Sequence, residues 1–166
     1  MSDVPTQARA ELFRDAMSAL ASGVAVITAR RPDGRPTGLL ATSVAAYSAA
    51  PPSIMLSVAH SSRSHPVLVE HAERFGVHLL ARGQEAMARA FASRAEAKYA
   101  GLQWDWDGEV PCLAGVVSYL RCRRTAVFAH YDHSVLIGDV LDGRHAGGEA
   151  LLWVRRRMDW RLSPEG

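Results

Sequence analysis

Hydroxyl and guanidinium side chains gather at residues 61–64 (SSRS), directly ahead of a His-Pro pair. Ser64 has the side chain of a helix N-cap and Pro66 suits the first helical turn, so the pattern predicts a helix start here. A helix start offers unpaired N–H donors, and Arg63 adds a bidentate partner for phosphate. The residues therefore indicate a phosphate site, although a capped surface helix with no ligand would have the same pattern.

A second segment, residues 38–43 (GLLATS), combines small side chains with two hydroxyls. Small residues let a planar ligand approach the backbone, whose N–H groups can then bond to the polar edge of a ring. A close-packed strand with surface hydroxyls is the alternative interpretation.

A third segment, residues 130–134 (HYDHS), lies between two expected strands. His130 and His133 could be metal ligands, but no third strong ligand is near in sequence, so we expect no metal site. A turn in which Asp132 orients His133 toward a ligand is one interpretation, and a merely exposed turn is the other.

The C-terminal run 153–162 contains four arginines interleaved with two tryptophans. Such a run could stack on bases or bind pyrophosphate. A terminal strand with a solvated basic face is the interpretation that composition favours.

Composition narrows the class of protein. With 166 residues, 48% hydrophobic and a net charge of +2, the chain has the composition of a globular protein, and we expect one domain over residues 1–166 with no nucleic-acid partner. Cys112 and Cys122 match no metal or redox spacing and are expected to be buried thiols in a reducing compartment. No apolar run has the length of a membrane helix and no signal peptide is evident, so the sequence predicts a cytoplasmic protein.

The elements that must position these residues are mostly strands. Periodicity and turn residues predict helices over 9–22 and 84–94, a short helical segment at 66–71, and a loop with two tryptophans over 101–111. Strands are expected at 24–28, 38–47, 53–59, 75–81, 113–121, 123–129, 134–141 and 150–155, with a hairpin turn at 31–34 and turns at Asp142-Gly143 and Gly147-Gly148. Many short strands and few helices favour an antiparallel barrel with peripheral helices. The Gly-rich loops that commonly bind dinucleotides are missing from the sequence.

In their order, these segments resemble the flavin reductase family with the FMN-binding split-barrel fold. The matching stretches are 23–28 (GVAVIT), the Asp33-Gly34 turn, 38–43, 50–56 (APPSIML), 61–64, 75–80 (FGVHLL), 84–92, 131–135 (YDHSV) and 137–140 (IGDV). The resemblance extends over about residues 11–162. Three positions depart from the family pattern: Leu40 stands where Thr is usual, Tyr131 where Gly is usual, and Met158 where Tyr is common. Tyr131 leaves two possibilities, a turn with negative φ or an aromatic ring that covers the site.

The resemblance implies a mainly β, antiparallel Greek-key split barrel with peripheral helices, and an NAD(P)H:flavin oxidoreductase. Such an enzyme reduces FAD or FMN with NADH or NADPH, NADH being favoured, and supplies reduced flavin to a separate monooxygenase. The setting expected is a natural-product pathway, such as antibiotic biosynthesis, or an aromatic-compound pathway. A homodimer is also implied.

The resemblance assigns residues to roles. Hydride transfer would involve His133, oriented by Asp132. The residues that would bind flavin are Leu40, Ala41, Thr42, Ser43, Ser57, Ser61, Ser62, Arg63, Ser64, Ala92 and Lys98.

Two alternatives stay open. One is a non-catalytic flavin- or haem-binding split-barrel protein. The other is an enzyme similar to pyridoxamine phosphate oxidase, which would be expected to have more basic phosphate ligands in its first strands.

Overall fold

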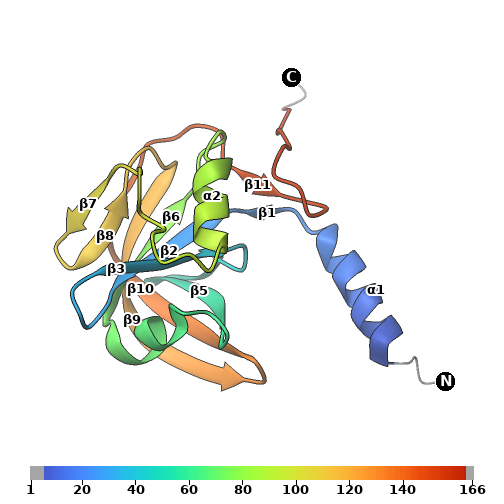
Figure 1. The fold of residues 1–166 in the computed structure, drawn as a ribbon, viewed down its shortest axis with the longest axis horizontal. Coiled ribbons are helices and arrows are strands. Elements are labelled where there is room, and N and C mark those ends of the chain that lie inside the picture. The colour runs from blue at the N-terminus through green and yellow to red at the C-terminus, as the bar shows by residue number, and fades with distance from the viewer. Residues whose placement is uncertain (1–5, 164–166) are drawn as a thin grey trace.

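Strands dominate the computed structural model of this chain, which describes residues 6–163 (Figure 1). In chain order the elements are α1 (Thr6–Ser18), β1 (Ser22–Gly23), β2 (Ala25–Arg30), β3 (Pro36–Ala41), β4 (Ala45–Ala49), β5 (Pro52–Ala59), the π-helical turn η1 (Val67–His71), β6 (Arg74–Leu79), α2 (Glu85–Ala92), β7 (Trp104–Asp107), β8 (Val110–Leu113), β9 (Ser118–His130), β10 (His133–His145) and β11 (Leu152–Trp153). The mainly β class with peripheral helices is confirmed.

Seven of the strands form one antiparallel sheet in the order β3-β2-β6-β9-β10-β5-β4. The first and last strands in this order, β3 and β4, are consecutive in the chain and are joined by residues 42–44. Within this link, the Ser43 hydroxyl accepts the N–H of Ser57 at 3.0 Å and donates to its carbonyl at 3.1 Å. The two edges of the sheet thereby meet, which gives the expected barrel.

The apolar run of β2 is explained by a core on each of its faces. Ala25 and Ile27 belong to the barrel interior, together with residues of β3, β5, β6 and η1. Val24 and Val26 belong to a second core that α2 and the β7–β8 hairpin cover. A strand that is buried on both sides needs no polar alternation, so its continuous apolar character follows.

The expected loop over 101–111 is wrong, because this segment contains strands β7 and β8. Gly108 makes the turn between them with a φ of +62°, a value that favours glycine. Trp104 packs edge-on against Tyr99 on one side and Trp106 on the other. The tryptophans thus belong to a paired and packed hairpin.

Two further expectations about strands need correction. The segments 113–121 and 123–129 were expected as separate strands, but most of this region is the single strand β9, and β10 runs through the expected turn at Asp142-Gly143. Gly143 serves a close approach, since a Cβ there would lie 2.5 Å from the Tyr119 carbonyl oxygen. The expected strand 38–47 is divided into β3 and β4 by the link that closes the barrel.

The first helix also differs from expectation. It ends at Ser18, before the predicted end at residue 22, and Gly23 lies in β1 instead of terminating the helix. None of the residues of α1 is buried, and the helix projects away from the barrel (Figure 1). Its apolar side chains are exposed: Leu12, Phe13, Met17 and nearby Leu20.

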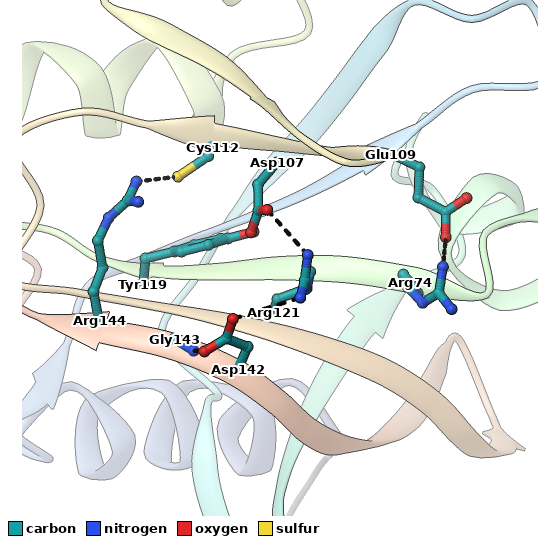
Figure 2. A network of polar contacts seen from close by, with 9 residues as sticks. All are labelled: Arg74, Asp107, Glu109, Cys112, Tyr119, Arg121, Asp142, Gly143 and Arg144. Carbon is teal, nitrogen blue, oxygen red and sulfur yellow. Dashed lines mark hydrogen bonds and ion pairs between the residues drawn. The ribbon is translucent and has the colours of Figure 1, made fainter.

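A polar network joins the β7–β8 hairpin to β9 and β10 (Figure 2). The Asp107 carboxylate accepts a hydrogen bond from the Tyr119 hydroxyl at 2.9 Å and one from Arg121 at 3.0 Å. Arg121 also forms an ion pair with Asp142 at 3.5 Å. Each of these charges has a partner within the protein, so we regard the network as structural.

Both cysteines are buried free thiols, as predicted. Burial raises the pKa of each thiol. Arg144 donates a hydrogen bond to Cys112 Sγ at 2.6 Å (Figure 2).

Candidate functional site

The cavity that gathers most of the predicted ligand-binding residues, termed the main cavity, has a volume of about 430 Å³ and lies where β3, the link to β4, β5, the 60–65 loop and the end of α2 meet. This volume is within the range of small-molecule sites. Most of the residues predicted to hold a ligand line it: Leu40, Ala41, Thr42, Ser43, Ser57, Ser61, Ser62, Arg63, Ala92, Lys98 and His133. Residues from six separate segments of the sequence are therefore brought to one place.

The loop that contains the hydroxyl cluster is attached to the barrel wall through Ser64. This side chain is buried, and its hydroxyl donates to the Gly38 carbonyl at 3.0 Å and lies 2.9 Å from the Thr37 hydroxyl. Ser64 therefore faces β3 and does not line the main cavity. It is not an N-cap either, because the π-helical turn begins at Val67 after Pro66 and has no side-chain cap. The N-cap prediction is wrong because Ser64 is buried against β3, where its hydroxyl donates to the Gly38 carbonyl.

The remainder of this loop offers hydrogen-bond donors to the cavity. Within residues 6–163, neither the N–H of Ser61 nor that of Arg63 has a protein acceptor. The Arg63 guanidinium is 63% exposed and lies 3.7 Å from Glu96. An exposed ion pair of this length contributes little, so Arg63 is free to bind an anion.

A second cation, Lys98, stands at the same wall of the cavity. Its ammonium donates to the carbonyls of Gly38 at 3.1 Å and Phe91 at 3.0 Å. Burial, and to a lesser degree the charge of Arg63, lower the pKa of Lys98. Carbonyls hold the ammonium in place without neutralising it, so the wall keeps a positive potential that suits phosphate.

The part of the cavity wall next to Lys98 is apolar and closely packed. A Cβ at Gly38 would lie 2.7 Å from the Phe91 ring, so only glycine lets α2 pack so closely on β3. Leu39, Leu40 and Ala41 continue this wall into the cavity. An apolar wall beside phosphate donors is suited to a flat ring with a phosphorylated tail.

His133 enters the cavity from the start of β10. Its Nδ1–H donates to the Asp132 carboxylate at 2.8 Å, and this hydrogen bond lowers the pKa of Asp132. The carboxylate itself is 88% exposed and does not line the cavity. The contact fixes the ring and leaves Nε2 available to a ligand.

The turn before His133 contains Tyr131, for which a negative φ or a ring covering the site was expected. Its φ is +50°, so a turn with negative φ is excluded. The ring is 88% exposed, lies against His130 at 4.0 Å between centroids, and is not among the cavity-lining residues. The chain keeps a backbone conformation that glycine would adopt more readily.

Sequence reasoning missed several cavity residues, namely Leu39, Val58, Ala59, Phe91, Ser93 and Arg94. Arg94 is the last residue of the helix predicted over 84–94 and lies two residues past its observed end at Ala92, so it could have been found from that prediction. The C-terminal arginines, by contrast, are not in the lining. Arg156 forms an ion pair with Asp15 at 2.8 Å, and Trp160 donates to the Val154 carbonyl.

Two other kinds of feature are absent from residues 6–163. No group of three or more His, Cys, Asp or Glu side chains is arranged to hold a metal ion in this part of the chain. Likewise, no described helix has the length and apolar character needed to span a membrane.

Comparison with known proteins gives consistent matches. The model of a family described as the flavin reductase like domain matches residues 17–160. The chain is 35% identical over 149 residues to an FMN reductase (NADH) of Agrobacterium fabrum, covering 89% of this chain and 84% of that protein. It is 39% identical over 149 residues to an NADH:riboflavin 5'-phosphate oxidoreductase of Streptomyces pristinaespiralis, covering 87% and 84%.

Solved structures agree with this fold. An NADH:FAD oxidoreductase of Streptomyces globisporus, in complex with NAD and FAD fragments, superposes with a TM-score of 0.87 at 26% identity over 99% of both chains. The flavin reductase of a styrene monooxygenase from Pseudomonas putida superposes with a TM-score of 0.84 at 28% identity, over 92% of this chain and 98% of that one.

Proposed function

We propose that this chain, which belongs to the flavin reductase family, carries out its reaction in the main cavity, where NADH reduces FMN or FAD. The chain is an NAD(P)H:flavin oxidoreductase, and the reduced flavin serves a separate monooxygenase, as in the reductase components among its relatives. The observation that carries the assignment to this cavity is the pairing of an apolar wall with unpaired donors and two cations at Arg63 and Lys98.

The described residues fit a flavin. The flat apolar surface from Leu40 and Ala41 would receive the ring, with the Thr42 hydroxyl at its edge. Ser61, Ser62 and Arg63 would bind phosphate through hydroxyl, backbone and guanidinium donors. Ser64, predicted for this role, would instead hold the loop in place. When bound, the two cofactors supply the hydride chemistry, and the protein contributes their position and electrostatics.

His133 is the residue that we assign to the nicotinamide. Asp132 fixes the imidazole by accepting from Nδ1, so Nε2 can donate to or accept from the incoming ligand. Hydride transfer demands no proton abstraction from this ring. The role of His133 is therefore to orient a ring against the flavin, for which near-contact geometry is essential.

Turnover tests the function. Purified protein mixed with NADH and FMN or FAD is expected to show flavin-dependent loss of nicotinamide absorbance. His133→Ala should lower kcat/KM for NADH about tenfold or more while the flavin Kd changes little. Absence of turnover with every flavin and both nicotinamides would support the alternative of a non-catalytic flavin- or haem-binding protein. A larger effect on flavin binding than on NADH would reassign His133.

A homodimer is the assembly that we propose. Its support is the exposed apolar face of α1, where Leu12 is 66% and Phe13 65% exposed. A 13-residue helix without a packing surface is marginal in water, so a second copy would supply the missing contacts. Sedimentation analysis is expected to give a dimer that Phe13→Glu weakens, whereas Gln7→Glu on the same helix does not. A monomeric wild-type protein would contradict the proposal.

For location and pathway we propose the cytoplasm and an oxygenase of natural-product, such as antibiotic, or aromatic-compound metabolism. The two free buried thiols are suited to a reducing compartment. Cell fractionation and a search for an oxygenase that is active only with this reductase would test both points.

A further inference from the structure

Two histidines on either side of the 61–64 loop meet at one buried hydroxyl. His60 Nε2 lies 3.1 Å and His65 Nε2 2.9 Å from the Ser134 Oγ. The two rings are in edge contact with centroids 4.7 Å apart, and Ser134 is 2% exposed. Neither histidine nor Ser134 lines the main cavity, so this contact stands behind the loop.

The chemistry of this contact is directional. A serine hydroxyl has one hydrogen and two lone pairs, so it can donate to one imidazole and accept from the other. In this arrangement the Nε2 of one ring carries a proton and the Nε2 of the other does not. Burial, followed by the proximity of His60, lowers the pKa of His65, which favours the neutral form of that ring.

The contact completes a two-sided attachment of the loop. On one side Ser64 bonds to Gly38 of β3. On the other, the two histidines bond to Ser134 of β10, and the N–H of His60 donates to the Asp132 carbonyl at 2.8 Å. Ser61, Ser62 and Arg63 lie between the two attachments and are the residues that face the cavity.

We propose that Ser134, acting through His60 and His65, is a positioning residue that sets the 61–64 loop for the flavin phosphate. The proposal rests on the proposed function and deepens it. Ser134 also directly follows His133, so the same strand that presents the nicotinamide-facing ring holds the phosphate loop. Because the loop would act on the phosphate and not on the ring, Ser134 should affect phosphorylated flavins selectively.

The test compares FMN with riboflavin, which lacks the phosphate, as substrates of Ser134→Ala. The KM for FMN is expected to rise about fivefold to tenfold, because loss of the hydroxyl breaks its contacts with both histidines and loosens the loop, with kcat at saturating FMN and the KM for riboflavin little changed. Ser134→Thr, which keeps the hydroxyl, should restore most of the affinity for FMN.

The chain offers a matched control at the other end of β10, where the hydroxyl of Ser118 in β9 lies 2.6 Å from His145 Nδ1. Ser118→Ala removes an equivalent serine–histidine contact away from the cavity and should leave both KM values unchanged. A second variant, His65→Phe, keeps a ring and removes the nitrogen. Combined with Ser134→Ala it should raise the KM for FMN no further than either change alone.

The results of these experiments distinguish a failure of the positioning role from a failure of the proposed function. Equal effects of Ser134→Ala on FMN and riboflavin, additive effects of Ser134→Ala and His65→Phe, or a similar effect of Ser118→Ala would overturn the positioning role while the reductase activity stands. Wild-type protein that uses FMN and riboflavin with the same KM would also overturn it, because the loop would then bind no phosphate. Wild-type protein with no turnover at all would instead contradict the proposed function.

Discussion

The main cavity and the network in Figure 2 both contain charged side chains, but these charges are compensated by protein partners in the network and not in the cavity. In the network, the Asp107 carboxylate accepts from both Tyr119 and Arg121, so its charge is compensated within the protein. In the cavity, Arg63 is mostly exposed with one long ion pair, and Lys98 contacts only carbonyls among the described residues. Charged groups that have no close counter-charge and face a cavity, rather than polar groups as such, are what mark a binding site.

This difference predicts separable effects of mutation. Changes in the network should lower the free energy of unfolding and leave the flavin KM alone. Changes in the cavity should raise the flavin KM and leave the free energy of unfolding almost unchanged. The predictions that follow test this separation.

The largest effect is expected from Asp107→Ala, which removes two hydrogen bonds and leaves Arg121 with only its pair to Asp142. At roughly 1 to 1.5 kcal/mol for each bond, the free energy of unfolding should fall by about 2 to 3 kcal/mol in urea titrations. Asp105→Ala, at an exposed residue of the same strand, should cost much less. A rise in flavin KM with unchanged stability would mean that the network belongs to the site.

Acid should weaken the same side of the molecule through His78, which is stacked on Tyr119. Burial lowers the pKa of His78 to about 3, and its Nε2 has no hydrogen-bond partner. The folded protein therefore binds fewer protons than the unfolded chain between pH 6.5 and 3, and stability is lost as pH falls through this range. With an unfolded pKa near 6.5, the expected loss between pH 7 and pH 5 is about 2 kcal/mol.

Unfolding curves at the two pH values provide the measurement, and His78→Leu provides the control. The leucine variant has no group that titrates at this position, so it should lose less stability on acidification than the wild type. His65, whose pKa is also lowered, remains in both proteins and cancels in the comparison. An identical loss in both proteins would show that His78 is not the cause.

On the cavity side, Arg63→Ala should raise the KM for FMN about tenfold, as expected for a charge-assisted hydrogen bond to phosphate. The free energy of unfolding should change little because the side chain is exposed. Arg82, which pairs with Glu149 outside the cavity, is the matched control. A loss of stability without an effect on KM would remove Arg63 from the phosphate site.

Elements of the fold that depend on residues close together in sequence could be predicted from the sequence. The arrangement of the site depends on contacts between distant residues and could not be derived in this way. The strand and hairpin around 24–41 were correct because β-branched runs and an Asp-Gly turn are local signals. The gathering of 40–43, 61–63 and His133 in one cavity followed from the family resemblance, since no local rule places β3 beside the start of β10.

The errors arose where tertiary contacts override local signals. Asp142-Gly143 has turn composition, but Gly143 pairs with Leu120 of β9 at a place where a Cβ would meet the Tyr119 carbonyl oxygen, so the glycine serves a continuing strand. Ser64 has cap composition, but its burial against Gly38 engages the hydroxyl elsewhere. The Ser134 contact with two histidines had no sequence signal, because its members are brought together only by the pairing of β5 with β10.

The smallest predicted effect concerns Tyr131, at the tip of the hairpin beside the cavity. Its left-handed φ of +50° costs a non-glycine residue roughly 1 kcal/mol, while glycine loses more chain entropy on folding. Tyr131→Gly should therefore raise the free energy of unfolding by about 0.5 kcal/mol and leave the KM for NADH unchanged, as the ring is outside the cavity lining. His130→Gly, at a strand position without positive φ, should instead destabilise the protein. A higher KM for NADH in Tyr131→Gly would show that this exposed ring contributes to nicotinamide binding, which would extend the site beyond the cavity to the hairpin tip.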